Sequence, residues 1–297
     1  MAKYWKTAVR VVAYAFIYIF FMLLCQIVFG LTLGGAGREM TEAIVSGRYG
    51  DPAALAEAAD AATQAINVYV QRNSGLILSI SALLSLLVFM KIYSARKLNL
   101  FAALRMDRPP SGTDMRYGAF AGASANFAIS LVAAVFQSMG LFSDAFMQHE
   151  AQMQMTYGTG GILATLLGVG IVVPIVEEIM FRGMVTSDLR RIMPWKAAVL
   201  TQGALFGLYH FIPVQICYTI PLGIYLGYIT YKTGSVWPAI AGHAAMNATA
   251  ILLTGPGMED AITQPLFSML FMIASVYMLI SALRYFVKKE PVPDDTA

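Results

Sequence analysis

An apolar stretch in the middle of the chain carries three ionisable side chains. Residues 168–176 are uncharged and mostly aliphatic, and Glu177, Glu178 and Arg182 follow them directly. An ionisable group at membrane depth costs about 2.5–3.5 kcal/mol on insertion scales, so such groups are usually functional. The stretch therefore predicts a chemical site inside a membrane.

Helical spacing gives the two carboxylates different surroundings. Residues four apart share a helix face, whereas adjacent residues diverge by about 100°. Glu178 is therefore expected beside Arg182, where the two charges neutralise each other. Glu177 points toward the face of Phe181 and has no local cation, which suits a general base. The alternative is an ion network of all three charges that only packs helices.

Two later apolar segments carry polar pairs with the same spacing. The first pair is Phe206 and His210, in which the ring can flank the imidazole and shield it from lipid. The second is His243 and Asn247. Each of these polar groups can simply hydrogen-bond a neighbouring helix. However, the chain has three histidines and two of them lie in apolar segments after the Glu pair, which favours one shared site.

Two chemistries fit this set of residues. In one, Glu177 and His210 activate a water that attacks a peptide carbonyl, while His243 and Asn247 donate hydrogen bonds to the oxyanion. In the other, His210, His243 and Glu177 bind Zn²⁺, which activates its own water. Asn247 is a poor zinc ligand and suits the oxyanion role better. Both chemistries stay open.

The composition places these residues in a membrane protein. Of the 297 residues, 58% are hydrophobic and 12% are charged, and the mean hydropathy is +0.65. Soluble domains carry about 25% charged residues. The net charge of +3 is too small to indicate nucleic-acid binding. Cys25 and Cys217 lie in apolar runs and are expected to be buried free thiols. We predict an all-α, polytopic transmembrane helical bundle.

The hydropathy pattern predicts about eight spans. They cover residues 11–33, 74–93, 118–140, 161–190, 197–211, 213–231, 236–254 and 265–285. Basic residues cluster in alternate loops and at both ends of the chain, which predicts that both termini are cytoplasmic. Glycines four apart in three spans predict close helix approach: Gly118 and Gly122, Gly203 and Gly207, and Gly223 and Gly227.

The domain organisation follows from these spans. Residues 1–150 are expected to hold three spans, an extracytoplasmic helical loop and a basic cytoplasmic loop. In the extracytoplasmic loop, Asp51 supplies an N-cap and Pro52 a first-turn proline for a helix at 53–70. Residues 151–287 form the catalytic core with spans four to eight, and residues 288–297 form a polar tail.

The three motifs, in this order on successive apolar segments, resemble the CPBP family. This family comprises the CAAX prenyl endopeptidases and the bacteriocin-processing or immunity proteins, also called the Abi family. The resemblance covers about residues 155–255. It implies an intramembrane endopeptidase in which Glu177, His210, His243 and Asn247 are catalytic. The supporting residues are Glu178, Arg182 and Phe206. Members have been described both as metalloproteases and as metal-independent glutamate proteases.

The expected activity is therefore cleavage of a membrane-associated peptide or protein. The expected location is the plasma membrane of a bacterium, where the lipid bilayer surrounds the protein. Zn²⁺ is expected as a cofactor only if the mechanism is metal-dependent. One alternative is a non-catalytic immunity or scaffolding protein of the same family. Another is a proton-coupled transporter, but such proteins usually contain internal repeats, and none is visible in this sequence.

Overall fold

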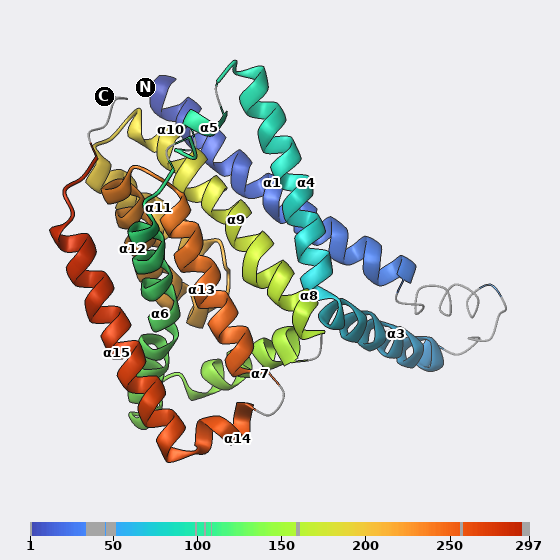
Figure 1. The fold of residues 1–297 in the computed structure, drawn as a ribbon. Coiled ribbons are helices and arrows are strands. Elements are labelled where there is room, and N and C mark those ends of the chain that lie inside the picture. The colour runs from blue at the N-terminus through green and yellow to red at the C-terminus, as the bar shows by residue number, and fades with distance from the viewer. Residues whose placement is uncertain are drawn as a thin grey trace.

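The computed structural model describes residues 2–33, 45, 52–98, 100–103, 105–107, 109–158, 161–255 and 258–292. Within these residues every regular element is a helix and no strand is found, which confirms the all-α prediction. Both cysteines are free, but only Cys25 is buried; the expectation that Cys217 is buried was wrong, because its side chain lies on an exposed face. Both ends of the drawn chain lie at the same end of the bundle (Figure 1).

The helices have the following bounds: α1 (Ala2–Leu33), α3 (Pro52–Arg72), α4 (Ser74–Ala95), α5 (Leu100–Ala103), α6 (Gly112–Ser138), α7 (Ser143–Gly158), α8 (Ile162–Leu167), η1 (Gly168–Val172), α9 (Val173–Glu178), η2 (Ile179–Val185), α10 (Thr186–Arg190), α11 (Trp195–Leu208), α12 (Pro213–Thr233), α13 (Trp237–Leu253), α14 (Met258–Thr263) and α15 (Pro265–Lys288).

The protein is a multi-pass membrane protein. In the described part of the chain, five helical segments are long and apolar enough to cross a membrane: Ala2–Thr32, Ser74–Ala95, Gly112–Ser138, Ile162–Arg190 and Pro265–Lys288. Helices α11, α12 and α13 do not meet both conditions. The 14 residues of α11 reach only about 21 Å, whereas the hydrocarbon core is about 30 Å thick. The count of eight spans stays a prediction.

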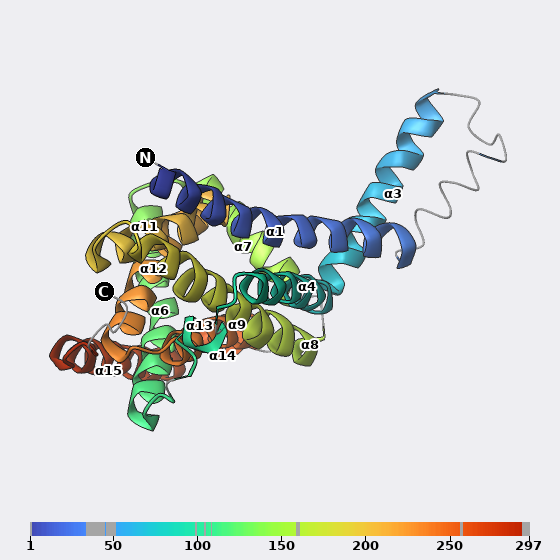
Figure 2. The same ribbon diagram turned by 90° about the horizontal axis from the view of Figure 1, so that it is seen from above.

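The helix that carries Glu177 is central and irregular. Seen along the bundle, α9 lies between α4 and α13 (Figure 2). The segments α8, η1, α9, η2 and α10 form one continuous helix in which η1 and η2 have π geometry. These π segments flank α9, where Glu177 is located, and π geometry often occurs at functional sites. At 1.5 Å per residue, Glu177 lies roughly 20 Å from either end of this helix.

Glycines bring the neighbouring helices into backbone contact, as their spacing predicted. A Cβ added to Gly122 on α6 would collide with the carbonyl of Gly242 on α13. A Cβ on Gly203 of α11 would lie 2.5 Å from Ile224 of α12. Because Gly242 directly precedes His243, the contact between α6 and α13 helps to set the position of that histidine.

A buried carboxylate ties three helices together near the chain termini. Asp188 on α10 is buried and pairs with Arg10 of α1 at 3.0 Å and with Arg96, just after α4, at 3.2 Å. The hydroxyl of Tyr14 on α1 donates a third bond to Asp188 at 2.9 Å. This Asp188 cluster holds α1 and α4 against the helix that carries Glu177.

Candidate active site

Glu178 is the centre of a buried ion network. Its Oε1 lies 2.9 Å from Nη1 of Arg182, one helical turn away, and 2.8 Å from Nδ1 of His243. All three side chains are buried. The expected pairing of Glu178 with Arg182 is thus present, and α13 adds a histidine that the spacing along one helix could not predict.

His243 lies between two carboxylates. Because the Glu178 carboxylate accepts, Nδ1 of His243 donates its proton there. The other ring nitrogen, Nε2, lies 3.8 Å from Oε2 of Glu177. Nε2 is therefore an acceptor in the neutral ring and a second donor in the imidazolium.

His210 lies in the turn after α11 and not within a helix. The sequence predicted a span that continued to residue 211, but α11 ends at Leu208. The carbonyls of the last helical turn lack partners within the helix. Nδ1 of His210 lies 2.8 Å from one of them, that of Phe206. A carbonyl only accepts, so Nδ1 carries the proton and Nε2 keeps a lone pair.

The Phe206 ring packs between the charged and the imidazole groups. The guanidinium of Arg182 lies 4.3 Å from the ring centroid. The rings of His210 and His243 lie 5.0 Å and 5.6 Å from it, both edge to face. Phe206 is fully buried. It therefore contacts Arg182 and both histidines at once and helps to hold them in place.

Asn247 forms a hydrogen bond to the helix that carries Glu177. Its Nδ2 donates to the carbonyl of Val169 on η1 at 2.9 Å. An amide has two N–H donors, so one remains for another partner. Asn247 also lines the cavity that contains Glu177, so the structure combines a helix-bridging contact with access to the candidate site.

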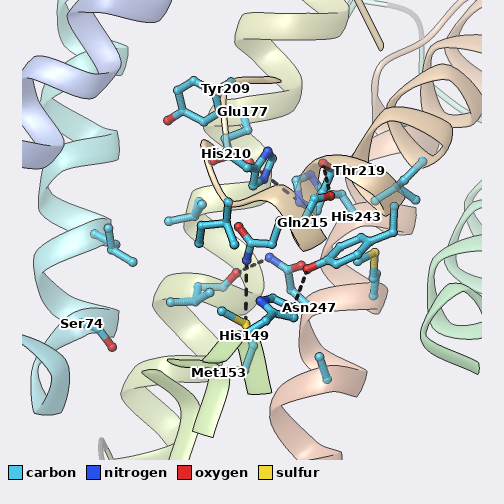
Figure 3. Close-up of a pocket in the computed structure, with 18 of the residues that line it drawn as sticks. Ser74, His149, Met153, Glu177, Tyr209, His210, Gln215, Thr219, His243 and Asn247 are labelled. Atoms are coloured by element: carbon cyan, nitrogen blue, oxygen red, sulfur yellow. Dashed lines mark hydrogen bonds and ion pairs between the residues drawn. The ribbon is translucent and has the colours of Figure 1, made fainter. Parts of the chain in front are cut away.

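A cavity of about 700 Å³ is lined by Glu177, Phe206, His210, His243 and Asn247, whereas Glu178 and Arg182 lie behind its wall. Figure 3 shows Glu177, His210 and His243 toward one end of it, His149 and Met153 toward the other, and Asn247 between. The sequence analysis left His149 of α7 unassigned, yet all three histidines of the chain line this cavity. His149 lies 3.4 Å from the Tyr218 hydroxyl.

Two tyrosines beside Glu177 were also missed. Tyr18 of α1 is buried and interacts with Glu177 and with Tyr209. The rings of Tyr18 and Tyr209 meet edge to face at 5.6 Å. Tyrosines are common in membrane helices, so nothing in the sequence marked Tyr18, which lies far from the three motifs in the chain.

The histidines and carboxylates do not gather as a metal site. Across the described residues, no group of three or more His, Cys, Asp and Glu side chains is arranged to hold an ion. His210 directs Nδ1 to a carbonyl, and His243 directs Nδ1 to Glu178, which already pairs with Arg182. Such bonds are usual for a metal-ligating histidine and leave Nε2 of both rings available. The donor set of His210, His243 and Glu177 does not fit Zn²⁺ in this arrangement because the three side chains do not come together as one group.

The fold and the site define a helical membrane protein with a buried carboxylate and histidine centre. Residues 159–249 match the family model described as Rce1-like type II CAAX prenyl endopeptidase. This range contains every candidate site residue of the three motifs. Residues 159–249 are thus similar to an Rce1-like domain, as the resemblance to the CAAX proteases indicated, and proteins of that family are membrane proteases. Comparisons with curated proteins and with solved structures found no match.

Proposed function

We propose that the chain is an intramembrane endopeptidase in which Glu177 and His210 activate a water molecule. One observation carries the proposal: the buried Glu177 carboxylate lies 3.8 Å from Nε2 of His243, within a cavity that His210 also lines. Arg182 forms its ion pair with Glu178, so the Glu177 carboxylate is available to act on a substrate.

In the proposed reaction, Glu177 carries one proton from the attacking water to the leaving amine. Glu177 takes a proton from the water as its oxygen bonds to the peptide carbonyl carbon, and Nε2 of His210 accepts the water's other hydrogen bond. The carbonyl oxygen becomes an oxyanion. When the carbon–nitrogen bond breaks, Glu177 returns the proton to the leaving amine, as general acid–base catalysis requires.

His243 and Asn247 are proposed to stabilise the oxyanion. Nδ1 of His243 already donates to Glu178, so Nε2 donates to the oxyanion only when both ring nitrogens are protonated. The charges of Glu177, Glu178, Arg182 and protonated His243 then sum to zero, which favours burial of the group. The second N–H of Asn247 supplies a further donor.

The proposed substrate is a membrane-associated peptide or a segment of a membrane protein, and the proposed location is a bacterial plasma membrane with both chain termini in the cytoplasm. The glutamate-type mechanism is favoured over the metal-dependent one because, among the described residues, His210, His243 and Glu177 do not come together as a group that could hold an ion. A protein that keeps these residues for stability alone, such as a non-catalytic immunity or scaffolding protein, would not depend on the Glu177 charge.

The test compares peptide termini in membranes of cells that make equal amounts of the wild type or Glu177→Gln. The matched control is Glu57→Gln, because Glu57 is exposed on α3. We expect new termini with the wild type and the control and none with Glu177→Gln. Identical termini in all three samples, with Glu177→Gln folded, would assign the chain to the non-catalytic class.

A further inference from the structure

The cavity of the candidate active site leads toward only one end of the bundle. Its lining continues from Glu177 to Gln71 on α3, Ser74 at the start of α4, and His149 and Met153 on α7. In Figure 1, α3, α7 and α8 lie at the end of the molecule away from both chain termini. The substrate path therefore runs between Glu177 and that end.

The opposite end is closed by the hydrophobic core. On α1, Tyr18 lines the cavity, but Tyr14, one turn earlier and part of the Asp188 cluster, is buried and does not. On α12, Leu222 lines the cavity, whereas Leu226 is fully buried beyond it. Met184, two turns past Glu177, is also fully buried. No lining residue lies on the far side of these side chains.

The charges distinguish the two ends. The described charged residues near the open end are mostly acidic and belong to α3, α7 and α14: Glu57, Asp60, Arg72, Asp144, Glu150 and Asp260. The closed end carries the arginines of the Asp188 cluster and a second basic group in which Lys232 bonds the carbonyl of Lys289. Basic residues stay on the cytoplasmic side of a membrane. The cavity therefore opens on the extracytoplasmic side.

The lining selects for uncharged groups. Between Glu177 and the mouth, the polar lining comes from neutral amides and hydroxyls, such as Asn126, Ser130 and Gln215. Burial lowers the pKa of His149, so this imidazole is held in its neutral form. The apolar remainder includes Ile77. Such a surface can bond a peptide backbone but offers no counter-charge to a charged side chain.

The depth of the site fixes how the substrate must enter. Glu177 lies about 22 Å from the start of its helix at Ile162. An extended chain spans about 3.3–3.6 Å per residue, so about six or seven residues are needed to reach it. The volume of about 700 Å³ lies in the range of small-ligand sites, which has no room for a folded domain.

We infer that the cavity takes an extended, uncharged polypeptide segment that enters from the extracytoplasmic side. The cleavage of this segment rests on the proposed endopeptidase function. The side of entry rests on the cavity and on the distribution of charge, and it can be tested independently of any activity.

The first experiment measures the side of the cavity mouth. In a background with Cys25→Ala and Cys217→Ala, Gln71→Cys places a thiol at the mouth and Ser94→Cys places one at the other end of α4, where Ser94 is exposed. A membrane-impermeant maleimide is added to intact cells and to inverted vesicles. We expect Gln71→Cys to react at least tenfold faster in intact cells than in inverted vesicles. Ser94→Cys should react at least tenfold faster in inverted vesicles than in intact cells. The reverse pattern would overturn the inference.

The second experiment tests entry through this mouth. A small charged, impermeant thiol reagent is added outside cells that make Gln215→Cys, and Glu177-dependent termini are then counted. We expect the reagent to reduce the number of Glu177-dependent termini at least tenfold with Gln215→Cys and not at all with Ser94→Cys. We also expect the cleaved sequences to carry uncharged residues for about six positions around each terminus. Unchanged cleavage, or charged residues at those positions, would overturn the inference. Outside labelling of Gln71→Cys without any Glu177-dependent termini would instead overturn the proposed function and support the side of opening.

Discussion

Nδ1 of His243 lies 2.8 Å from Oε1 of Glu178, the same oxygen that Nη1 of Arg182 reaches at 2.9 Å. One buried carboxylate thus orients a histidine from another helix and neutralises the arginine of its own helix. The network links the stability of the bundle to the geometry of the candidate active site, because the other nitrogen of His243 faces Glu177.

We predict that Glu178→Gln lowers the free energy of unfolding by about 3–5 kcal/mol, the usual cost of leaving one member of a buried pair without its partner. Arg182→Gln should have a similar effect. The double variant should be less destabilised than the sum of the two single variants, because it leaves no uncompensated charge of the pair. Thermal unfolding of the purified protein in detergent measures all three, and strict additivity would contradict the coupling.

The local part of this network was predictable from the sequence. The pair of Glu178 and Arg182 follows from helical spacing alone, and the irregular helix geometry after Glu178 leaves it intact. The bond of Glu178 to His243 joins residues 65 positions apart, so it depends on how α9 packs against α13. The sequence supplied the types of residue at the site but not this contact.

Two other features could not be predicted for different reasons. No glycine follows the end of α11 at Leu208, and the first proline is Pro213; Gly207, one residue before the end, packs against Ile220 of α12 and does not mark a stop. His210 was therefore expected on a helix face, and the structure places it in a turn. Tyr18 reaches Glu177 because α1 packs against α4 and is tied to α10 through Asp188, and no local pattern encodes these contacts.

We predict that His210→Asn folds normally but cleaves more slowly by a factor of about 10²–10⁴, the usual contribution of a positioned proton-transfer group. An Asn amide can still donate to the Phe206 carbonyl, which His210 contacts at 2.8 Å, but it lacks the lone pair of Nε2. The rate of appearance of Glu177-dependent termini measures the effect. A rate near that of the wild type, at equal protein level, would remove His210 from the reaction.

The contact between α6 and α13 offers a test of packing. We predict that Gly122→Ala destabilises the protein by about 1–3 kcal/mol, because the new Cβ would collide with the Gly242 carbonyl. The matched control is Gly112→Ala on the same helix, where a Cβ meets nothing within 4 Å. Thermal unfolding should separate the two variants. Because Gly242 precedes His243, Gly122→Ala should also reduce cleavage, whereas equal behaviour of both variants would contradict the packing argument.

Asp188 should be the main anchor of α1. Asp188→Asn leaves Arg10 and Arg96, which bind opposite oxygens of the buried carboxylate at 3.0 Å and 3.2 Å, with no charge between them. We predict a loss of about 3 kcal/mol, at the lower end for a broken buried pair because both arginines are partly exposed. Limited proteolysis should then cut α1 first, and cleavage activity should fall as Tyr18 moves away from Glu177. Asp144→Asn, at an exposed carboxylate on α7, is the control and should behave as the wild type. Equal protease resistance in the two variants would mean that lipid and the apolar contacts of α1, rather than Asp188, hold this helix in place.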